Sequence, residues 1–116
     1  MGVRFVPILH QNEPESLLNE AVSRLRDTLA PAAIYLYGSY VYGKPRAHSD
    51  LDLLVILEQS DSTPFERDAA AYRALSGLGV PKDVQVYTRG EFEQRARLPV
   101  SFERTVKTKG RLLYAA

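Results

Sequence analysis

Two aspartates stand at the start of the most apolar segment of this sequence. Asp50 and Asp52 open the stretch DLDLLVIL, and ten residues separate the pair Gly38-Ser39 from Asp50. Side chains alternate along a strand, so the two aspartates should share one face, about 7 Å apart. Carboxylates brought within about 4 Å repel each other by about 4 kcal/mol at an effective dielectric near 20. Mg²⁺ prefers carboxylates, phosphate oxygens and water, and would turn that repulsion into attraction.

The Gly-Ser pair has the composition of a phosphate-binding turn. Glycine lets a phosphate approach the backbone closely. Ser39 is predicted to begin a short helical turn whose N–H groups and hydroxyl can hold the terminal phosphates of a triphosphate. Lys44 and Arg46 lie in the following loop and can reach the same anion. His48 is read as a solvated loop residue, because the other histidine, His10, is far away in the sequence.

Helical and strand-like patterns alternate along the chain, which predicts an α/β (α+β) fold with a small mixed sheet and helices packed against it. A chain of 116 residues is expected to form one domain. The capping boxes Thr63-x-x-Glu66 and Thr88-x-x-Glu91 each begin a helix. The expected helices cover about 14–29, 64–78, 89–98 and 102–109, and the expected strands 33–37, 51–57, 84–87 and 112–114.

The order of these segments predicts where the polar residues meet. A helix of crossover length joins strands 51–57 and 84–87, so these strands should run parallel, with both starts at one edge. If strand 33–37 runs antiparallel beside 51–57, its end at Gly38 lies at the same edge. Asp83, at the start of the third strand, would then face Asp50 and Asp52. Strand tyrosines such as Tyr37 are expected in the core rather than in a site.

The bulk composition excludes several classes of protein. The sequence has no cysteine, which rules out disulfides and thiolate metal sites and fits a cytoplasmic protein. A net charge of +1 without a Lys/Arg block gives no indication of direct nucleic-acid binding. No signal peptide or membrane-spanning segment is predicted, so no membrane partner is expected.

The spaced pattern Gly38-Ser39 and Asp50-x-Asp52, followed by Asp83 on the next strand, resembles the signature of the DNA polymerase β-type nucleotidyltransferase superfamily. The small size and the closing segment KTKGRLLYA resemble the minimal nucleotidyltransferases (MNT proteins), which are commonly paired with a HEPN-domain protein in toxin–antitoxin pairs. The likeness covers about residues 32–114. Tyr40 and Tyr42 depart from it, because relatives often carry a basic or small residue after the Gly-Ser.

The resemblance implies a role for each matching residue. Gly38 and Ser39 would bind the nucleotide, and Asp50, Asp52 and Asp83 would be the catalytic residues that hold Mg²⁺. Asp83 would also activate the attacking hydroxyl. The implied activity is transfer of AMP from ATP, or of another nucleoside monophosphate from its triphosphate, to a hydroxyl of a partner macromolecule. By resemblance, that acceptor is a tyrosine of a HEPN toxin, which the chain would neutralise as an antitoxin.

Two other functions remain open from the sequence. The chain can act as an antitoxin by protein binding alone, with an idle active site and the locally basic carboxy-terminal helices as the contact surface. Nucleotidylation of a small molecule shares the same motif. That activity would normally require an additional domain.

Overall fold

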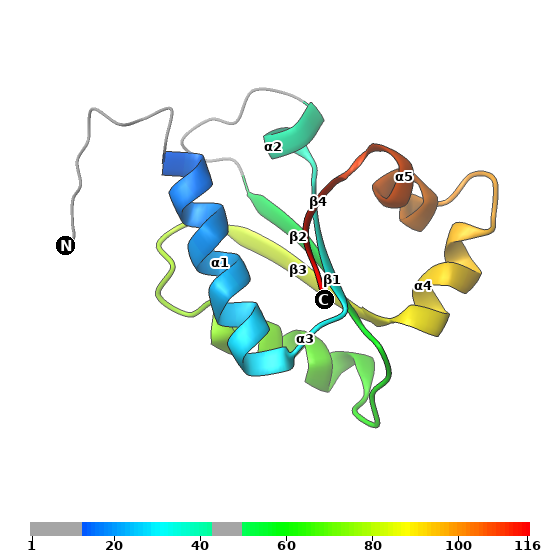
Figure 1. Ribbon diagram of the computed structural model, residues 1–116, viewed down its shortest axis with the longest axis horizontal. Coiled ribbons are helices and arrows are strands. Elements are labelled where there is room, and N and C mark those ends of the chain that lie inside the picture. The colour runs from blue at the N-terminus through cyan, green and yellow to red at the C-terminus, as the bar shows by residue number, and fades with distance from the viewer. Residues whose placement is uncertain (1–12, 43–49) are drawn as a thin grey trace.

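The computed structural model describes residues 13–42 and 50–116 of the chain (Figure 1). Within these residues the fold has five helices and four strands, and the predicted mixed sheet with helices packed against it is confirmed. In chain order the elements are α1 (Glu13–Leu29), β1 (Ala33–Tyr37), α2 (Ser39–Tyr42), β2 (Leu51–Leu57), α3 (Pro64–Ala74), β3 (Lys82–Thr88), α4 (Arg89–Ala96), α5 (Phe102–Lys109) and β4 (Arg111–Ala115).

The sheet has the strand order β3-β2-β1-β4. β2 and β3 are parallel, as the crossover helix between them predicted, and β1 and β2 are antiparallel neighbours, which meets the condition set from the sequence. β4 adds to the free side of β1 in antiparallel orientation, so β3 and β4 form the two edges. The end of β1 and the starts of β2 and β3 therefore lie at one end of the sheet.

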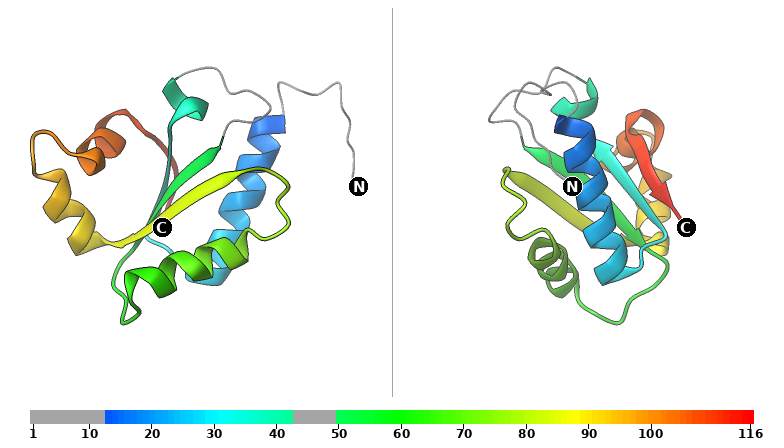
Figure 2. Two further views of the ribbon diagram at one scale, coloured as in Figure 1. Left: turned by 180° about the vertical axis from the view of Figure 1, so that it is seen from behind. Right: turned by 60° about the vertical axis from the view of Figure 1, so that its left-hand side comes forward.

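The two faces of the sheet are buried by different helices (Figure 2). The apolar residues of β2 alternate between them: Leu53 and Val55 belong to the core with α1 and α3, whereas Leu54 and Ile56 pack with Phe92 of α4. Asp52 lies two residues before Leu54 on β2. Because side chains alternate along a strand, its side chain points to the same face as Leu54, the face that carries α4 and α5.

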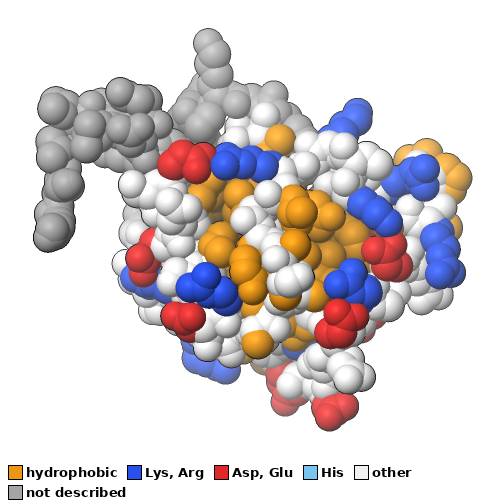
Figure 3. Space-filling view, in the orientation of Figure 1, with side chains coloured by type: hydrophobic (Ala, Val, Ile, Leu, Met, Phe, Trp, Pro, Cys, Tyr) orange, Lys and Arg blue, Asp and Glu red, His pale blue; other side chains and the backbone are white. Residues whose placement is uncertain are grey.

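The connection between α4 and α5 presents apolar side chains to solvent. Val100 is 96% exposed, Leu98 is 56% exposed and Phe102, the first residue of α5, is 42% exposed. Figure 3 shows this apolar surface at the outer end of the two helices, with Lys and Arg side chains beside it. We call Leu98, Val100 and Phe102 the hairpin patch.

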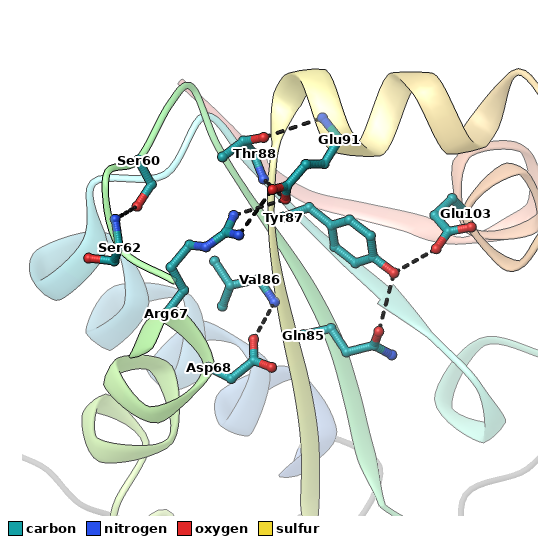
Figure 4. Close-up of polar contacts among 10 residues, drawn as sticks. All are labelled: Ser60, Ser62, Arg67, Asp68, Gln85, Val86, Tyr87, Thr88, Glu91 and Glu103. Carbon is teal, nitrogen blue, oxygen red and sulfur yellow. Dashed lines mark hydrogen bonds and ion pairs between the residues drawn. The ribbon is translucent and has the colours of Figure 1, made fainter. Parts of the chain in front are cut away.

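Helix α3 covers the open edge of β3. An edge strand has backbone N–H groups without a neighbouring strand, and exposed edges favour unwanted pairing. The carboxylate of Asp68 accepts the N–H of Val86 at 2.9 Å (Figure 4). One turn later, the hydroxyl of Tyr72 accepts the N–H of Val84 at 3.1 Å. Side chains of α3 thus replace the missing strand.

The end of α3 differs from the sequence expectation. The helix stops at Ala74, with Leu75 as its C-cap, and does not reach residue 78. Beyond it the chain continues in turns with i→i+3 hydrogen bonds, in which the N–H of Leu78 reaches the carbonyl of Leu75. Gly77 has a φ of 80°, so the backbone leaves the right-handed region here. A glycine can do this without the steric cost that other residues meet.

No helix of the described segments, 13–42 and 50–116, is long and apolar enough to cross a membrane.

Candidate functional site

The structure brings Asp52 and Asp83 together on neighbouring strands. In the parallel pairing of β2 with β3, Asp52 lies directly opposite Asp83. Asp52 is partly buried and Asp83 is exposed. Asp50 is also exposed and directly precedes the first residue of β2. The predicted convergence therefore holds most closely for Asp52 and Asp83, and Asp50 lies at the rim beside them.

The electrostatics of the site converge on Asp52. The pKa of its carboxyl group is raised from the ordinary 3.8 to about 6, mainly by burial and also by the charges of Asp83 and Asp50. These are the two causes by which burial and like charges disfavour an ionised carboxylate. The contribution of Asp50 places it within electrostatic reach of the pair.

The carboxylates provide the type of ligand that a divalent metal ion requires. Oxygen ligands from aspartate suit Mg²⁺, and a cation would relieve the repulsion that raises the pKa of Asp52. Among the described residues, no group of three acidic, histidine or cysteine side chains is already arranged to hold a metal ion. The donor set fits such an ion in its chemistry, with Asp52 and Asp83 opposite each other on β2 and β3.

Gly38 lies against the carboxylate of Asp52. Its φ is 80°, and a Cβ atom added there would overlap Asp52 Oδ2 and lie 3.0 Å from Asp52 Cγ. Only glycine combines this left-handed backbone with so close an approach. Ser39 then begins α2, which confirms the predicted short helical turn after the glycine. Gly38 and Asp52, distant in the sequence, therefore lie against each other.

Replacing Gly38 with Ala is expected to destabilise the protein by about 2 kcal/mol, because left-handed strain adds to a clash with Asp52. Gly77→Ala is the matched control: Gly77 has the same φ of 80°, and an added Cβ would meet nothing within 4 Å. It should lose only about 1 kcal/mol. Urea unfolding measures both losses. Equal losses in the two variants would contradict the close contact of Gly38 with Asp52.

Tyr72 contacts the site, and the sequence did not indicate it. Its hydroxyl donates a hydrogen bond to Asp83 Oδ1 at 3.2 Å while it accepts the N–H of Val84. The residue comes from α3, outside every motif in the sequence. The spacing of four residues from Asp68 could have suggested a shared helix face. Only the docking of α3 along β3 shows that this face meets the start of β3.

Tyr37 is a second neighbour of the acids. It pairs with Asp52 across β1 and β2 and is 8% exposed, so the expectation of a core position is correct. Its hydroxyl accepts a hydrogen bond from Gln85 Nε2 at 3.1 Å. Burial raises the pKa of Tyr37, and the charges of Asp83 and Asp52 contribute to the rise. Its ring meets Phe102 edge to face, with centroids 5.0 Å apart.

A polar connection leads from this neighbourhood to α5. Tyr87, two residues after Gln85 on β3, donates its hydroxyl to Glu103 Oε2 at 2.7 Å and lies 3.2 Å from Gln85 Oε1 (Figure 4). Glu103 is buried, with 7% of its surface exposed. Buried polar groups require such partners. This connection fixes α5, and with it Phe102, against the strands that carry the acids.

Lys44, Arg46 and His48, which the sequence placed in the loop before Asp50, lie outside the described residues, as does His10. A cleft of about 280 Å³ lies elsewhere, between α1 and β4. Its rim holds Glu15 and Arg111, which form an ion pair at 2.8 Å. Since that cleft lies on the β4 side of the sheet, it is separate from the acidic pair on β2 and β3.

The structure thus presents two facing aspartates beside a glycine-serine turn on a four-stranded mixed sheet. The sequence model described as "Nucleotidyltransferase domain" matches residues 16–112. The chain therefore belongs to the nucleotidyltransferase domain family, which assigns it to the proteins that transfer nucleotidyl groups and confirms the resemblance read from the sequence. No curated protein resembles the chain closely enough to count as a relative.

Solved structures share the fold. A toxin–antitoxin structure with AMP-PNP is 24% identical, with a TM-score of 0.62 over 85% of this chain and 73% of that chain. The MntA-HepT toxin–antitoxin structure is 20% identical, with a TM-score of 0.57 over 88% of this chain and 73% of that one. A protein from Sulfolobus solfataricus assigned to the nucleotidyltransferases is 19% identical, with a TM-score of 0.62 over 98% and 93%. At these identities the likeness establishes the fold.

Proposed function

We propose that this chain is a Mg²⁺-dependent protein adenylyltransferase that transfers AMP from ATP to a tyrosine hydroxyl of a HEPN-domain toxin and so acts as its antitoxin. The observation that carries this proposal is the facing pair Asp52 and Asp83 with Gly38 packed on the Asp52 carboxylate. The family provides the reaction type, and the MntA-HepT structure and the toxin–antitoxin structure with AMP-PNP suggest the partner and the nucleotide.

Each proposed site residue has a physical role in this reaction. Asp50, Asp52 and Asp83 would hold Mg²⁺, which when bound would offset the negative charge of the phosphates. Gly38 leaves room for a phosphate beside the backbone, and Ser39 contributes its hydroxyl. Asp83, exposed at the edge strand, takes the proton of the acceptor hydroxyl. Positioning and charge neutralisation account for most of the catalysis in such transfers.

The hairpin patch supports a macromolecular acceptor. Leu98, Val100 and Phe102 are exposed, and exposed apolar surface marks protein contact sites. The Phe102 ring packs on Tyr37, which is the cross-strand neighbour of Asp52. One member of the patch therefore packs on the strand next to the one that carries Asp52. A protein docked on the patch can present a hydroxyl to Asp83 without a second domain in this chain. A cytoplasmic location is part of the same proposal.

The direct test is transfer of label from α-³²P-ATP to the proposed partner, a HEPN-domain protein. With Mg²⁺ present, label is expected on a tyrosine of that protein, and EDTA should remove the transfer. The other three nucleoside triphosphates, labelled in the same way, test the choice of nucleotide. If the HEPN protein carries no label after incubation with any of the four nucleotides, the proposed reaction is refuted.

Neutralisation by binding alone is the second candidate, and the hairpin patch is the observation that favours it. Under this function the variant with both Asp50→Asn and Asp52→Asn still neutralises the toxin, whereas Val100→Lys, in the patch, does not. Under the transferase function the double variant loses neutralisation while it still binds. Toxin activity and a pull-down, measured for both variants, separate the two functions.

A further inference from the structure

The Tyr72 hydroxyl is held against a carboxylate of the proposed site from within the same chain. It donates to Asp83 Oδ1 at 3.2 Å and accepts the N–H of Val84 at 3.1 Å. The side chain is nevertheless open to solvent, with 38% of its surface exposed. A phenol that is hydrogen-bonded to a site carboxylate and accessible from solvent has the features of an acceptor hydroxyl in nucleotidyl transfer.

We propose that Tyr72 is an internal acceptor, so that the chain transfers a nucleoside monophosphate from a nucleoside triphosphate to its own Tyr72 hydroxyl. This inference rests on the proposed function, because it requires the same acidic site. It adds a modification site within the chain that is independent of any partner protein.

The geometry around Oη supports this assignment. A phenolic oxygen has one proton and two lone pairs. The proton is directed to Asp83, and one lone pair accepts the N–H of Val84. The second lone pair is free to attack. The N–H of Val84 also stabilises the negative charge that develops on the oxygen as it loses its proton.

The transfer balances without a further reagent. A bond forms between Tyr72 Oη and the α-phosphorus of the triphosphate, and the bond from that phosphorus to the oxygen bridging to the β-phosphate breaks. Pyrophosphate leaves with that bridging oxygen and its electron pair. The phenolic proton passes to Asp83. The product is a phosphodiester between Tyr72 and the nucleoside.

Other tyrosines near the acids differ in the two properties that matter. Tyr37 is 8% exposed, and its hydroxyl accepts from Gln85 rather than contacting a site acid. Tyr87 is directed to Glu103 on α5. Among the tyrosines whose side chains the structure describes, Tyr72 alone combines an exposed side chain with a hydrogen bond to Asp50, Asp52 or Asp83. Modification is therefore expected at this residue and not at its neighbours.

The test uses the full chain without any partner, incubated with Mg²⁺ and each α-³²P-labelled nucleoside triphosphate in turn. The expected result is one nucleotidyl group per chain by intact mass, located on Tyr72 by fragmentation of the peptide. The initial rate per chain should not change on dilution, because the hydroxyl and its carboxylate belong to one molecule. Tyr72→Phe should reduce the label to background. Tyr114→Phe, on β4, is the matched control and should keep it.

Tyr72→Phe loses the hydrogen bond to the N–H of Val84 and can lower the melting temperature. Locating the labelled residue in the wild-type chain decides the outcome in that case too. Label on another residue, or a rate per chain that rises with protein concentration, would overturn the inference. An unmodified chain that still labels the HEPN protein would overturn it while the proposed function stands. Label on Tyr72 without label on the HEPN protein would support it and contradict the proposed acceptor. Absence of label on both proteins would overturn both proposals.

Discussion

Asp52→Asn is expected to lower nucleotidyl transfer by about 10³-fold and, without metal, to stabilise the fold. The loss follows from removing a carboxylate that neutralises phosphate charge through a metal ion, an effect of several kcal/mol. The gain follows from removing a partly buried negative charge that faces Asp83. Activity and stability therefore change in opposite directions, as expected for a carboxylate retained for its chemistry.

The stability gain should depend on pH in a defined direction. The pKa of Asp52 is about 6 in the folded protein, above its ordinary 3.8, because of burial and then the charges of Asp83 and Asp50. Below about pH 4 the group is protonated in both folded and unfolded chains, and its favourable contribution is complete. That contribution is lost as the pH rises through 6. The loss is about 1 kcal/mol after allowance for solvent screening.

Thermal unfolding in EDTA measures this effect. At pH 8, Asp52→Asn should raise the melting temperature by about 4 °C, and at pH 4 the difference from wild type should vanish. Asp61→Asn, at an exposed aspartate in the loop after β2, is the control and should change little at either pH. Mg²⁺ should stabilise the wild type more than the variant. A variant less stable than wild type at pH 8 would contradict the repulsion between Asp52 and its neighbours.

Glu91→Ala is expected to destabilise the protein by about 3 kcal/mol, the largest loss of stability predicted here. Arg67, on α3, is only 4% exposed, and its guanidinium donates to both carboxylate oxygens of Glu91, at 2.9 and 3.1 Å (Figure 4). Removing the carboxylate leaves a buried positive charge without a counterion. It also removes the capping box of α4, because Glu91 accepts the N–H of Thr88.

Removing the other partner of this ion pair, Arg67, should destabilise the protein less. The difference between the two losses of stability is the informative result. Glu91 is 47% exposed, so water can solvate its charge when the guanidinium is gone. Arg67→Met keeps the length of the side chain and removes its buried charge, and the loss should be about 1 kcal/mol. Glu58→Ala breaks the exposed pair with Arg89 and should cost about 0.5 kcal/mol or less. Urea unfolding compares all three, and equal losses for Glu91→Ala and Arg67→Met would contradict the argument.

The local signals of the sequence were sufficient for the type and order of the helices and strands, although they placed the end of α3 too late. The boxes Thr63-x-x-Glu66 and Thr88-x-x-Glu91 form as predicted, because each needs only residues within one turn. Strand β1 has the predicted bounds, and so does β2. The crossover through α3 also fixed the parallel pairing of β2 with β3. The acids Asp52 and Asp83 were identified from type and spacing, while their roles stay proposals.

Register and helix docking were decided only by the tertiary structure. That Asp52 faces Asp83 depends on how β2 and β3 slide against each other, which packing across the whole sheet sets. Tyr72 reaches Asp83, and Phe102 reaches Tyr37, because α3 and α5 dock on opposite sides of the strands. Residues far apart in the sequence meet through buried side chains from several elements at once. No periodicity or motif within one segment contains that information, so the sequence indicated the acids and the fold identified their neighbours.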